Sequence, residues 1–172
     1  METLTTINPT ENILSSIQNY RGLLWEKIEQ FIKTFQGVEG VAKHNTEQMQ
    51  AEFPLKHTFE NGFYTREIFM PKGSLVVSFI HTQDHPSFFM SGEMSLVMDT
   101  GEVKRIKAPL TVHTKVGTQR VAYMHEDCTW VCVYKTDKTT VEEAEKEIYT
   151  DNFRELPTEF LENHKKELLC QG

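Results

Sequence analysis

The stretch 73-GSLVVSFIHTQDHPSFFMSGE-93 decides the fold class. It opens with a short apolar run rich in β-branched residues between glycines, a composition typical of a strand rather than a helix. Alternation along this run puts one set of side chains on each face: Leu75, Val77, Phe79 and His81 on the first, and Val76, Ser78 and Ile80 on the second. Both faces are apolar enough to be covered, as in a small barrel with helices outside. We therefore expect His81 to point into the barrel interior.

The same kind of pattern extends on both sides of this stretch, from Phe53 to about Lys135. Short alternating apolar runs such as LTVHT and TWVCVY are separated by turn signals. These signals are Asn61-Gly62, Pro71-Lys72-Gly73, Ser91-Gly92, Thr100-Gly101, Gly117 and Glu126-Asp127. Many short strands at this spacing predict a mainly β domain, either a closed antiparallel barrel or a sandwich.

Helical periodicity marks the N-terminal part of the chain. Asn8-Pro9 supplies a cap followed by proline at the first helical position, and Gly37 and Gly40 stop the pattern. One long helix over residues 9–36 is therefore predicted. Its apolar seam consists of Leu14, Ile17, Leu24, Ile28, Phe31 and Phe35. The seam fits packing against the chain's own β domain, and it also fits packing against a partner helix.

Helical character returns after the β region. Thr140 and Glu143 form a capping-box pattern in TTVEEAEKEI, and a second helix is predicted from about Pro157 to Leu169. The predicted organisation has three parts: an N-terminal helical segment (1–52), a β-barrel (53–135) and a C-terminal helical segment (136–172).

Composition and charge exclude several classes of protein. The 172-residue chain is 38% hydrophobic and 25% charged, with a formal net charge of −7. This acidic balance argues against general binding to nucleic acid or to anionic membranes. The sequence has no membrane-spanning apolar run and no signal segment, so a cytoplasmic location is expected. Cys128 and Cys132 lie four residues apart on one predicted strand, too far for a disulfide, which fits a reducing compartment.

His81 and His85 are the candidate metal ligands. A pair of inward neutral imidazoles at a strand end suits divalent Fe, Mn, Ni, Cu or Zn. A tight site needs three or four ligands, and His113 or His125 could supply a third. The alternative is that one histidine is a hydrogen-bonded core residue and the other caps the loop before Pro86.

This arrangement resembles the first motif of the cupin family, in which a glycine, His-x-His, a glutamate and a second glycine follow one another. Aligned on Gly92, His81 takes the position of the second histidine and His85 that of the glutamate. Phe79 stands where the first histidine would be. The resemblance therefore implies a motif with some of its usual metal ligands replaced.

The second cupin motif is matched only in part. Gly117 is retained, whereas Arg120 and Met124 stand where the family has histidine and asparagine. The resemblance implies a cupin-type antiparallel β-barrel of jelly-roll-like form. Because cupin-like barrels often dimerise, and the apolar helix seam fits that, it also implies a homodimer.

A closer resemblance is to small cupin-like proteins encoded by bacteriophages and some bacteria. Their motifs occur here in the same order, over about residues 54–135: His57-Thr58-Phe59, Tyr64-Thr65-Arg66-Glu67, Pro71-Lys72-Gly73, His81 with His85, Ser91-Gly92, Ala108-Pro109, Gly117 to Arg120, and Glu126-Asp127 before Trp130. This resemblance implies a phage-related protein, which would be located in the host-cell cytoplasm.

Arg120, Arg66 and Tyr64 are the predicted ligand-binding residues. An arginine is always charged, so a buried one needs a carboxylate partner or an anionic ligand. The candidate partners of Arg120 are Glu67, Glu93 and Glu126.

The strand TWVCVY has two distinct faces. Val131 and Val133 suit the barrel interior. Trp130, Cys132 and Tyr134 are expected to pack under a helix or across a subunit interface, and ligand stacking is the alternative for Trp130.

Together these features predict a cupin-like protein that binds a small, anionic ligand in its barrel, either with a divalent metal (Fe, Mn, Ni or Zn) or without a cofactor. If the protein is an enzyme, the family implies metal-dependent dioxygenase-like or isomerase-like chemistry. The alternative is a non-enzymatic interaction protein. In that case the barrel is a scaffold, and the helical termini or sheet edges bind a host protein or a second copy.

Overall fold

The computed structural model describes residues 13–14, 16–20, 22–34, 41–42, 52–98 and 100–169. Several predicted features lie outside these residues: the cap at Asn8-Pro9, the seam residue Phe35, and the helix stop at Gly37 and Gly40. No helix among the described residues is both long and apolar enough to cross a membrane.

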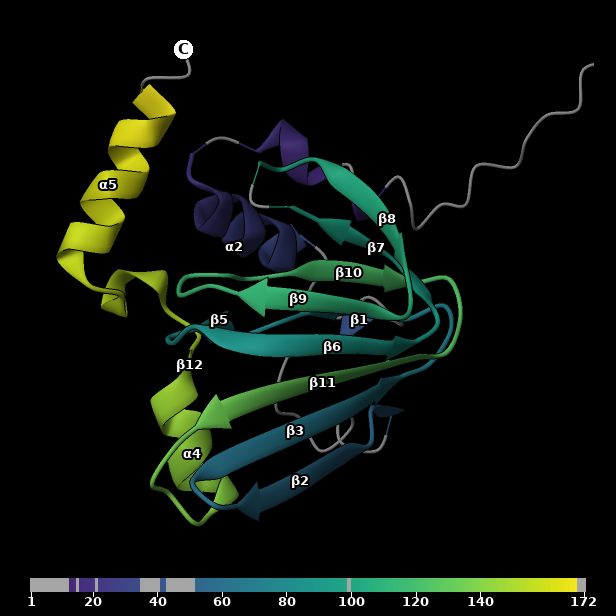
Figure 1. The fold of residues 1–172 in the computed structure, drawn as a ribbon. Coiled ribbons are helices and arrows are strands. Elements are labelled where there is room, and N and C mark those ends of the chain that lie inside the picture. The colour runs from purple at the N-terminus through teal and green to yellow at the C-terminus, as the bar shows by residue number, and fades with distance from the viewer. Residues whose placement is uncertain are drawn as a thin grey trace, which may run out of the picture.

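The described chain is mainly β and forms two five-stranded sheets (Figure 1). The first sheet has the order β1 (Val41–Ala42), β4 (Leu75–Val77), β10 (Val121–Met124), β7 (Glu93–Val97), β8 (Val103–Lys107). The second has the order β2 (Leu55–Glu60), β3 (Phe63–Met70), β11 (Cys128–Lys135), β6 (His85–Ser91), β9 (Leu110–Thr114). All neighbours are antiparallel except β1 and β4. A small ladder joins β5 (Ile80–His81) to β12 (Tyr149–Thr150).

The predicted turn signals lie where the chain reverses or passes from one sheet to the other. Asn61-Gly62 joins β2 to β3 within the second sheet, and Gly92 separates β6 from β7 on different sheets. Gly92 has φ of 93°, and a Cβ there would clash with the carbonyl oxygen of Asp127. Only glycine suits such a position without strain. The turn prediction is confirmed here.

The prediction of a closed barrel is not confirmed. Within the described residues, no ladder of hydrogen bonds joins the first five-stranded sheet to the second. The reason is local, because the chain crosses between sheets through turns such as Pro71-Lys72-Gly73, where strand pairing ends. The strands therefore form two layers that pack face to face, as in a jelly roll.

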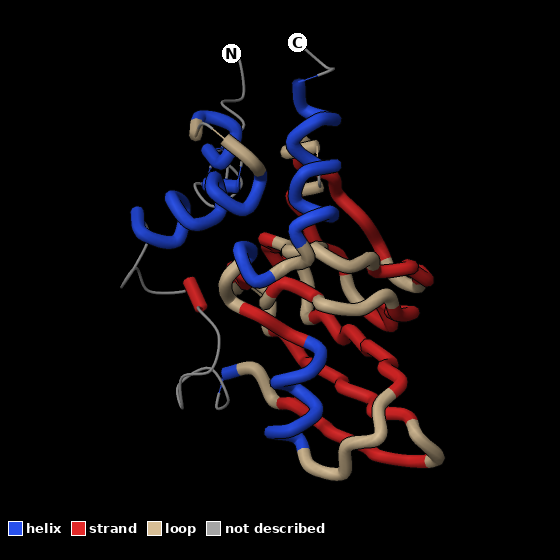
Figure 2. Tube along the Cα trace, turned by 90° about the vertical axis from the view of Figure 1, so that its left-hand side faces the viewer, coloured by secondary structure: helices blue, strands red, loops and turns tan. Residues whose placement is uncertain are grey.

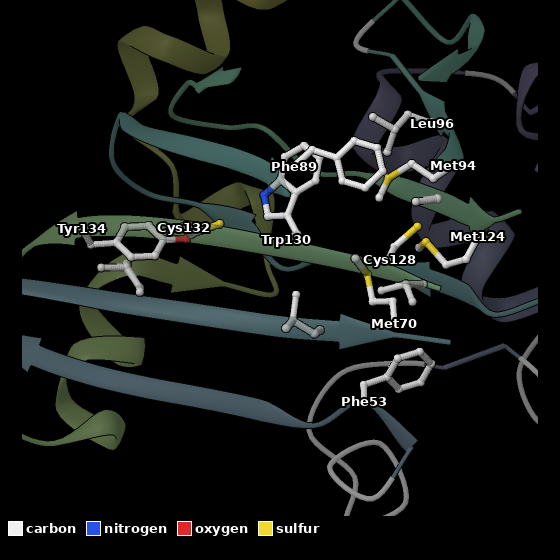
Figure 3. Packing of buried hydrophobic residues seen from close by; sticks show 14 of the residues in the cluster. Phe53, Met70, Phe89, Met94, Leu96, Met124, Cys128, Trp130, Cys132 and Tyr134 are labelled. Carbon is white, nitrogen blue, oxygen red and sulfur yellow. The ribbon is translucent and has the colours of Figure 1, made fainter. Parts of the chain in front are cut away.

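The main core lies between these two layers (Figure 3). It contains Trp130, Cys132 and Tyr134, whereas Val131 and Val133 are only half-buried. The expectation that the valines of β11 face the interior is therefore wrong. Both faces of this strand are apolar, and the large aromatic side chains gain more from full burial than the valines do.

The prediction of one long N-terminal helix is also wrong over the described residues. A 3₁₀-helix, η1 (Ser16–Asn19), is followed by a separate helix, α2 (Leu24–Thr34). Gly22, with φ of 105°, interrupts the helical conformation between them. The amide of Leu23 donates a hydrogen bond to the Glu26 carboxylate. This side-chain contact satisfies a donor at the new helix start.

The apolar seam packs on the chain's own domain, which is the first of its two predicted interpretations. Leu14, Ile17, Ile28 and Phe31 are fully buried. They pack on the outer face of the first sheet, in a cluster that includes Leu75, Val77, Val97, Val121 and Tyr123. The seam is therefore not available to a partner helix at these residues.

The two predicted C-terminal helices are present as α4 (Val141–Ile148) and α5 (Thr158–Leu169), with a 3₁₀-turn, η2 (Phe153–Glu155), between them (Figure 2). The predicted cap at Thr140 is confirmed, because the Thr140 side chain accepts from the amide of Glu143, and its hydroxyl also donates to the Glu143 carboxylate. Ala144 and Ile148 join the core between the sheets. In Figure 1 no described helix lies in front of the second sheet, so its outer face carries none of them.

Candidate ligand site

A cavity opens within the core between the two sheets. Its volume is about 100 Å³, counted as the space open to the centres of water molecules. A single water needs roughly 10–15 Å³ by the same measure, so the cavity has room for a compact ligand. Its polar lining residues are Arg66, Ser78, His81, Arg120 and Tyr149. The other walls are apolar or weakly polar and come from both sheets: Ile68, Met70, Val76, Phe79, Met94, Leu96, Ala122, Trp130 and Cys132. A mainly apolar cavity with a few polar groups is typical of a small-molecule site.

The strand that brings His81 to this cavity is interrupted. In β4, Val76 faces the cavity, while Leu75 and Val77 pack outward against the N-terminal helices. The prediction that Leu75 and Val77 share the inward face with His81 is therefore wrong.

The alternation of inward and outward side chains is interrupted after β4, because Ser78 and Phe79 are not in strand conformation. The amide of Ser78 donates to the carbonyl of Arg120, and the Ser78 hydroxyl accepts from the amide of Arg120. Both Ser78 and Phe79 line the cavity, so the alternation slips by one residue. His81 reaches the interior as expected, but through this irregularity.

His81 and His85 are both buried, with 4% and 2% of their surfaces exposed, and their ring centres lie 4.7 Å apart. The Nδ1 atom of His81 lies 3.2 Å from the Tyr134 hydroxyl, which in turn lies 2.7 Å from the Tyr149 hydroxyl. Burial raises the pKa of both tyrosines, so these hydroxyls remain protonated donors. The pair that the sequence predicted is therefore assembled.

His85 has one ring nitrogen in use and one without a partner. Nδ1 lies 3.0 Å from the carbonyl of Gln83, which can only accept, so Nδ1 carries the proton. Burial lowers the pKa of His85 to about 4, and the imidazole is neutral near pH 7. Nε2 is consequently a buried acceptor with no hydrogen-bond partner.

The predicted third metal ligand does not join this pair. The side chain of His113 on β9 is 63% exposed, and its Nε2 lies 4.0 Å from Asp84. The Nε2 atom of His125 lies 2.7 Å from the Ser95 hydroxyl. In the part of the chain that the structure describes, no three His, Cys, Asp or Glu side chains converge as metal ligands. The two imidazoles alone are too few for a centre of three or four protein ligands.

Arg120 lies in the cavity wall between a hydroxyl and an indole. Its Nη2 donates to the Thr114 hydroxyl at 3.0 Å, and its guanidinium carbon lies 5.4 Å from the centre of the Trp130 ring. Among its predicted partners, Glu93 hydrogen-bonds Arg105 and lies near Lys107. Stacking of a guanidinium on an indole is favourable and is compatible with hydrogen bonds in the plane of the guanidinium, such as the one to Thr114.

Arg66 reaches the cavity from β3, and its Nε donates to the Glu145 carboxylate of α4 at 3.2 Å. Its guanidinium also lies 5.7 Å from the centre of the Tyr149 ring. The third predicted ligand residue, Tyr64, is fully buried but does not line the cavity. Its hydroxyl lies 2.7 Å from His57 Nδ1 and 3.5 Å from the Glu145 carboxylate. Tyr64 therefore helps to position Glu145, the partner of Arg66, from outside the cavity.

Glu145 and Tyr149 are site residues that the sequence did not single out. Both lie in or directly after α4, far along the chain from Arg66. The only sequence signal was weak: Glu145 follows Ala144 and precedes Ile148 by three residues, so it borders the apolar face of the helix.

No protein-family model matches the chain, and no curated protein matches it. Solved structures with a similar arrangement include cupin domains. The Cupin_2 domain of an XRE family transcriptional regulator from Enterobacter cloacae is 16% identical, with 51% of this chain and 99% of that one covered and a TM-score of 0.42. Ectoine synthase from P. lautus is 12% identical, with 67% and 83% covered and a TM-score of 0.46. An acetylacetone dioxygenase from Acinetobacter johnsonii is 13% identical, with 55% and 72% covered and a TM-score of 0.41.

Proposed function

We propose that this chain binds a small anionic ligand in the cavity between its two sheets. The observation that carries the proposal is the presence of Arg66 and Arg120 in the lining of one mainly apolar cavity. A guanidinium in such surroundings is costly unless it meets an acceptor, and it binds carboxylate or phosphate oxygens through a planar pair of donors. His81 and Tyr149 add further polar contacts at the same cavity.

Membership of the cupin superfamily, and a relation to small phage-encoded cupin-like proteins, are part of this proposal. Their support is the order of the sequence motifs, several of which lie in turns between strands. Gly92 and Gly117, the glycines of the two cupin motifs, both have positive φ. A cupin-like binding protein is therefore the interpretation that unites the motifs with the cavity.

Calorimetric titration with acetate, butyrate, hexanoate and inorganic phosphate tests the anion site. We expect at least one of these anions to bind, and Arg120→Gln to weaken it by about tenfold or more, because a charge-assisted hydrogen bond contributes roughly 1.5–3 kcal/mol. Arg105→Gln is the matched control, since Arg105 is an exposed arginine outside the cavity lining. If none of the anions binds, or if both variants behave alike, the proposal is wrong.

The unpartnered Nε2 of His85 favours a second candidate, a divalent metal (Fe, Mn, Ni or Zn) held by His81 and His85. Because two imidazoles are too few, the ligand or water would have to complete the coordination. Metal analysis of untagged protein would find near-stoichiometric metal that is lost in His85→Gln and retained in His113→Gln. Absence of metal in the unsubstituted protein would rule this candidate out.

A homodimer also remains a proposal, although the helix seam no longer supports it. Its support is now the outer face of the second sheet, where Phe63, Phe69 and Met90 are 50%, 38% and 57% exposed. Light scattering of the full chain should give twice the chain mass, and Phe69→Lys should reduce it to the monomer.

A further inference from the structure

The cavity changes from polar to apolar along its length. On β3, the inward side chains are Arg66, then Ile68, then Met70. Inward residues of a strand lie two apart, so these levels are separated by roughly 6.7 Å. One wall therefore passes from a charged side chain to an unbranched apolar one.

The opposite wall changes in the same direction. Arg120 lies directly before β10, and Ala122 lies within it. The neighbouring strand β4 runs the other way: Val76 is paired with Ala122, and Ser78, directly after β4, is hydrogen-bonded to Arg120. The turn between β10 and β11 places the apolar ends of both walls together. Polar groups of both sheets thus share one end of the cavity.

Three methionines and a cysteine lie at the far, apolar end, and two of them, Met70 and Met94, line the cavity. Met70 is paired with Cys128 across β3 and β11, and Met94 is paired with Met124 across β7 and β10. Figure 3 shows these four side chains gathered at the end away from Tyr134. All four are buried, and the flexible thioethers of the three methionines adapt to apolar groups of different shape. This end suits an apolar tail and offers nothing to a second charge.

The polar end favours a carboxylate over a phosphate. The Glu145 carboxylate, 3.2 Å from Arg66, already places one negative charge beside the cavity. A dianionic head would be repelled by it more strongly than a monoanionic one. A planar carboxylate also matches the donor geometry of a guanidinium, and it is the smaller group for a cavity of about 100 Å³.

We propose that the ligand is a monocarboxylic acid with a short apolar tail, bound with its carboxylate at Arg120 and its tail toward Met70 and Met94. This inference rests on the proposed anion-binding function and adds the chemical class of the ligand and its orientation. Trp130, which lies under Arg120 and pairs with Ile68, forms the side wall at the level between head and tail.

Calorimetric titration of the full chain with acetate, butyrate, hexanoate and octanoate tests the inference, with hexanol and hexyl phosphate as matched probes. Affinity should rise about fourfold for each methylene, as expected for burial of apolar surface, until the chain outgrows the cavity. Hexanol and hexyl phosphate should both bind more weakly than hexanoate.

Ala122 offers a way to block the tail without touching the head. It is buried in the middle of the cavity wall, so Ala122→Leu should weaken hexanoate by about tenfold more than it weakens acetate. Ala122→Val should give a smaller loss, and it keeps the test available if the larger side chain prevents folding.

The outcomes separate this inference from the function beneath it. If no anion binds, or if hexanol equals hexanoate, anion binding itself fails. If anions bind but affinity does not rise from acetate to hexanoate, or if Ala122→Leu weakens both equally, the orientation is wrong and anion binding stands. Tighter binding of hexyl phosphate than of hexanoate would overturn the carboxylate class alone.

Discussion

The two faces of the first sheet differ sharply, although the same strands supply both. The outer face packs against η1 and α2 through aliphatic and aromatic side chains, and Leu14, Ile17, Ile28 and Phe31 are fully buried there. The inner face borders a cavity with charged and polar groups in its wall. Neighbouring residues of one strand therefore differ in role: one side chain packs against the helices, and the next lines the cavity.

The contrast teaches that close packing and ligand binding are divided between the two faces of the first sheet. A well-packed apolar layer contributes strongly to stability, because each buried side chain loses water and fills space. A cavity with buried charges contributes less and costs free energy unless it is occupied or hydrogen-bonded. Substitutions on the outer face should lower stability with binding intact, and substitutions on the inner face should act on binding.

The largest effect is expected on the outer face, at Phe31 of α2. Because its side chain is fully buried, Phe31→Ala should lower the free energy of unfolding by about 3–5 kcal/mol in denaturant titrations. The folded fraction should still bind hexanoate with unchanged affinity, since Phe31 does not line the cavity. The exposed neighbour Lys33→Ala is the control. A loss below about 1 kcal/mol, or a loss of binding in folded protein, would contradict the division between layers.

The next effect in size concerns the inner face and depends on pH. His85 has a pKa lowered to about 4 from the ordinary 6.5, so between these values the unfolded chain binds a proton that the folded protein excludes. The free energy of unfolding should therefore decrease as the pH falls from 6.5 to 4, by at most about 1.4 kcal/mol per pH unit and up to about 3 kcal/mol in total. Burial also lowers the pKa of His57, which acts in the same direction.

Two variants assign this slope to its source. His85→Gln should make the stability profile flatter between pH 4 and 6.5, measured by denaturant unfolding at successive pH values. His113→Gln removes an exposed histidine from the neighbouring strand and should leave the profile unchanged. An equal slope in all three proteins would show that the buried imidazole is not the cause.

Turns and helix starts could be predicted from the sequence because their causes are local. Gly92 is required by its own positive φ and by a close backbone contact, and Thr140 caps α4 by accepting from an amide three residues further on. The break in the N-terminal helix at Gly22 has a local cause too, but its apolar periodicity continues across the break and suggested one helix.

The inner face could be predicted only in part, because its causes are distant in the sequence. The slip at Ser78 depends on hydrogen bonds to Arg120, and the compensation of Arg66 depends on Glu145. Neither contact leaves a periodic signal. On β11 the two faces are both apolar, so alternation identifies the faces without indicating which one is inside.

The smallest effect is expected at the start of α4, the helix that carries Glu145 to the inner layer. Thr140→Ala removes the side-chain acceptor for the Glu143 amide and should lower the free energy of unfolding by about 1 kcal/mol. The adjacent exposed Thr139→Ala provides the matched control. Because Thr140 lies outside the cavity lining, Thr140→Ala should change hexanoate affinity much less than Arg120→Gln does, while Thr139→Ala should change neither quantity. A stability loss as large as that of Phe31→Ala would mean that the inner layer contributes as much to stability as the outer one, and that the division between them is wrong.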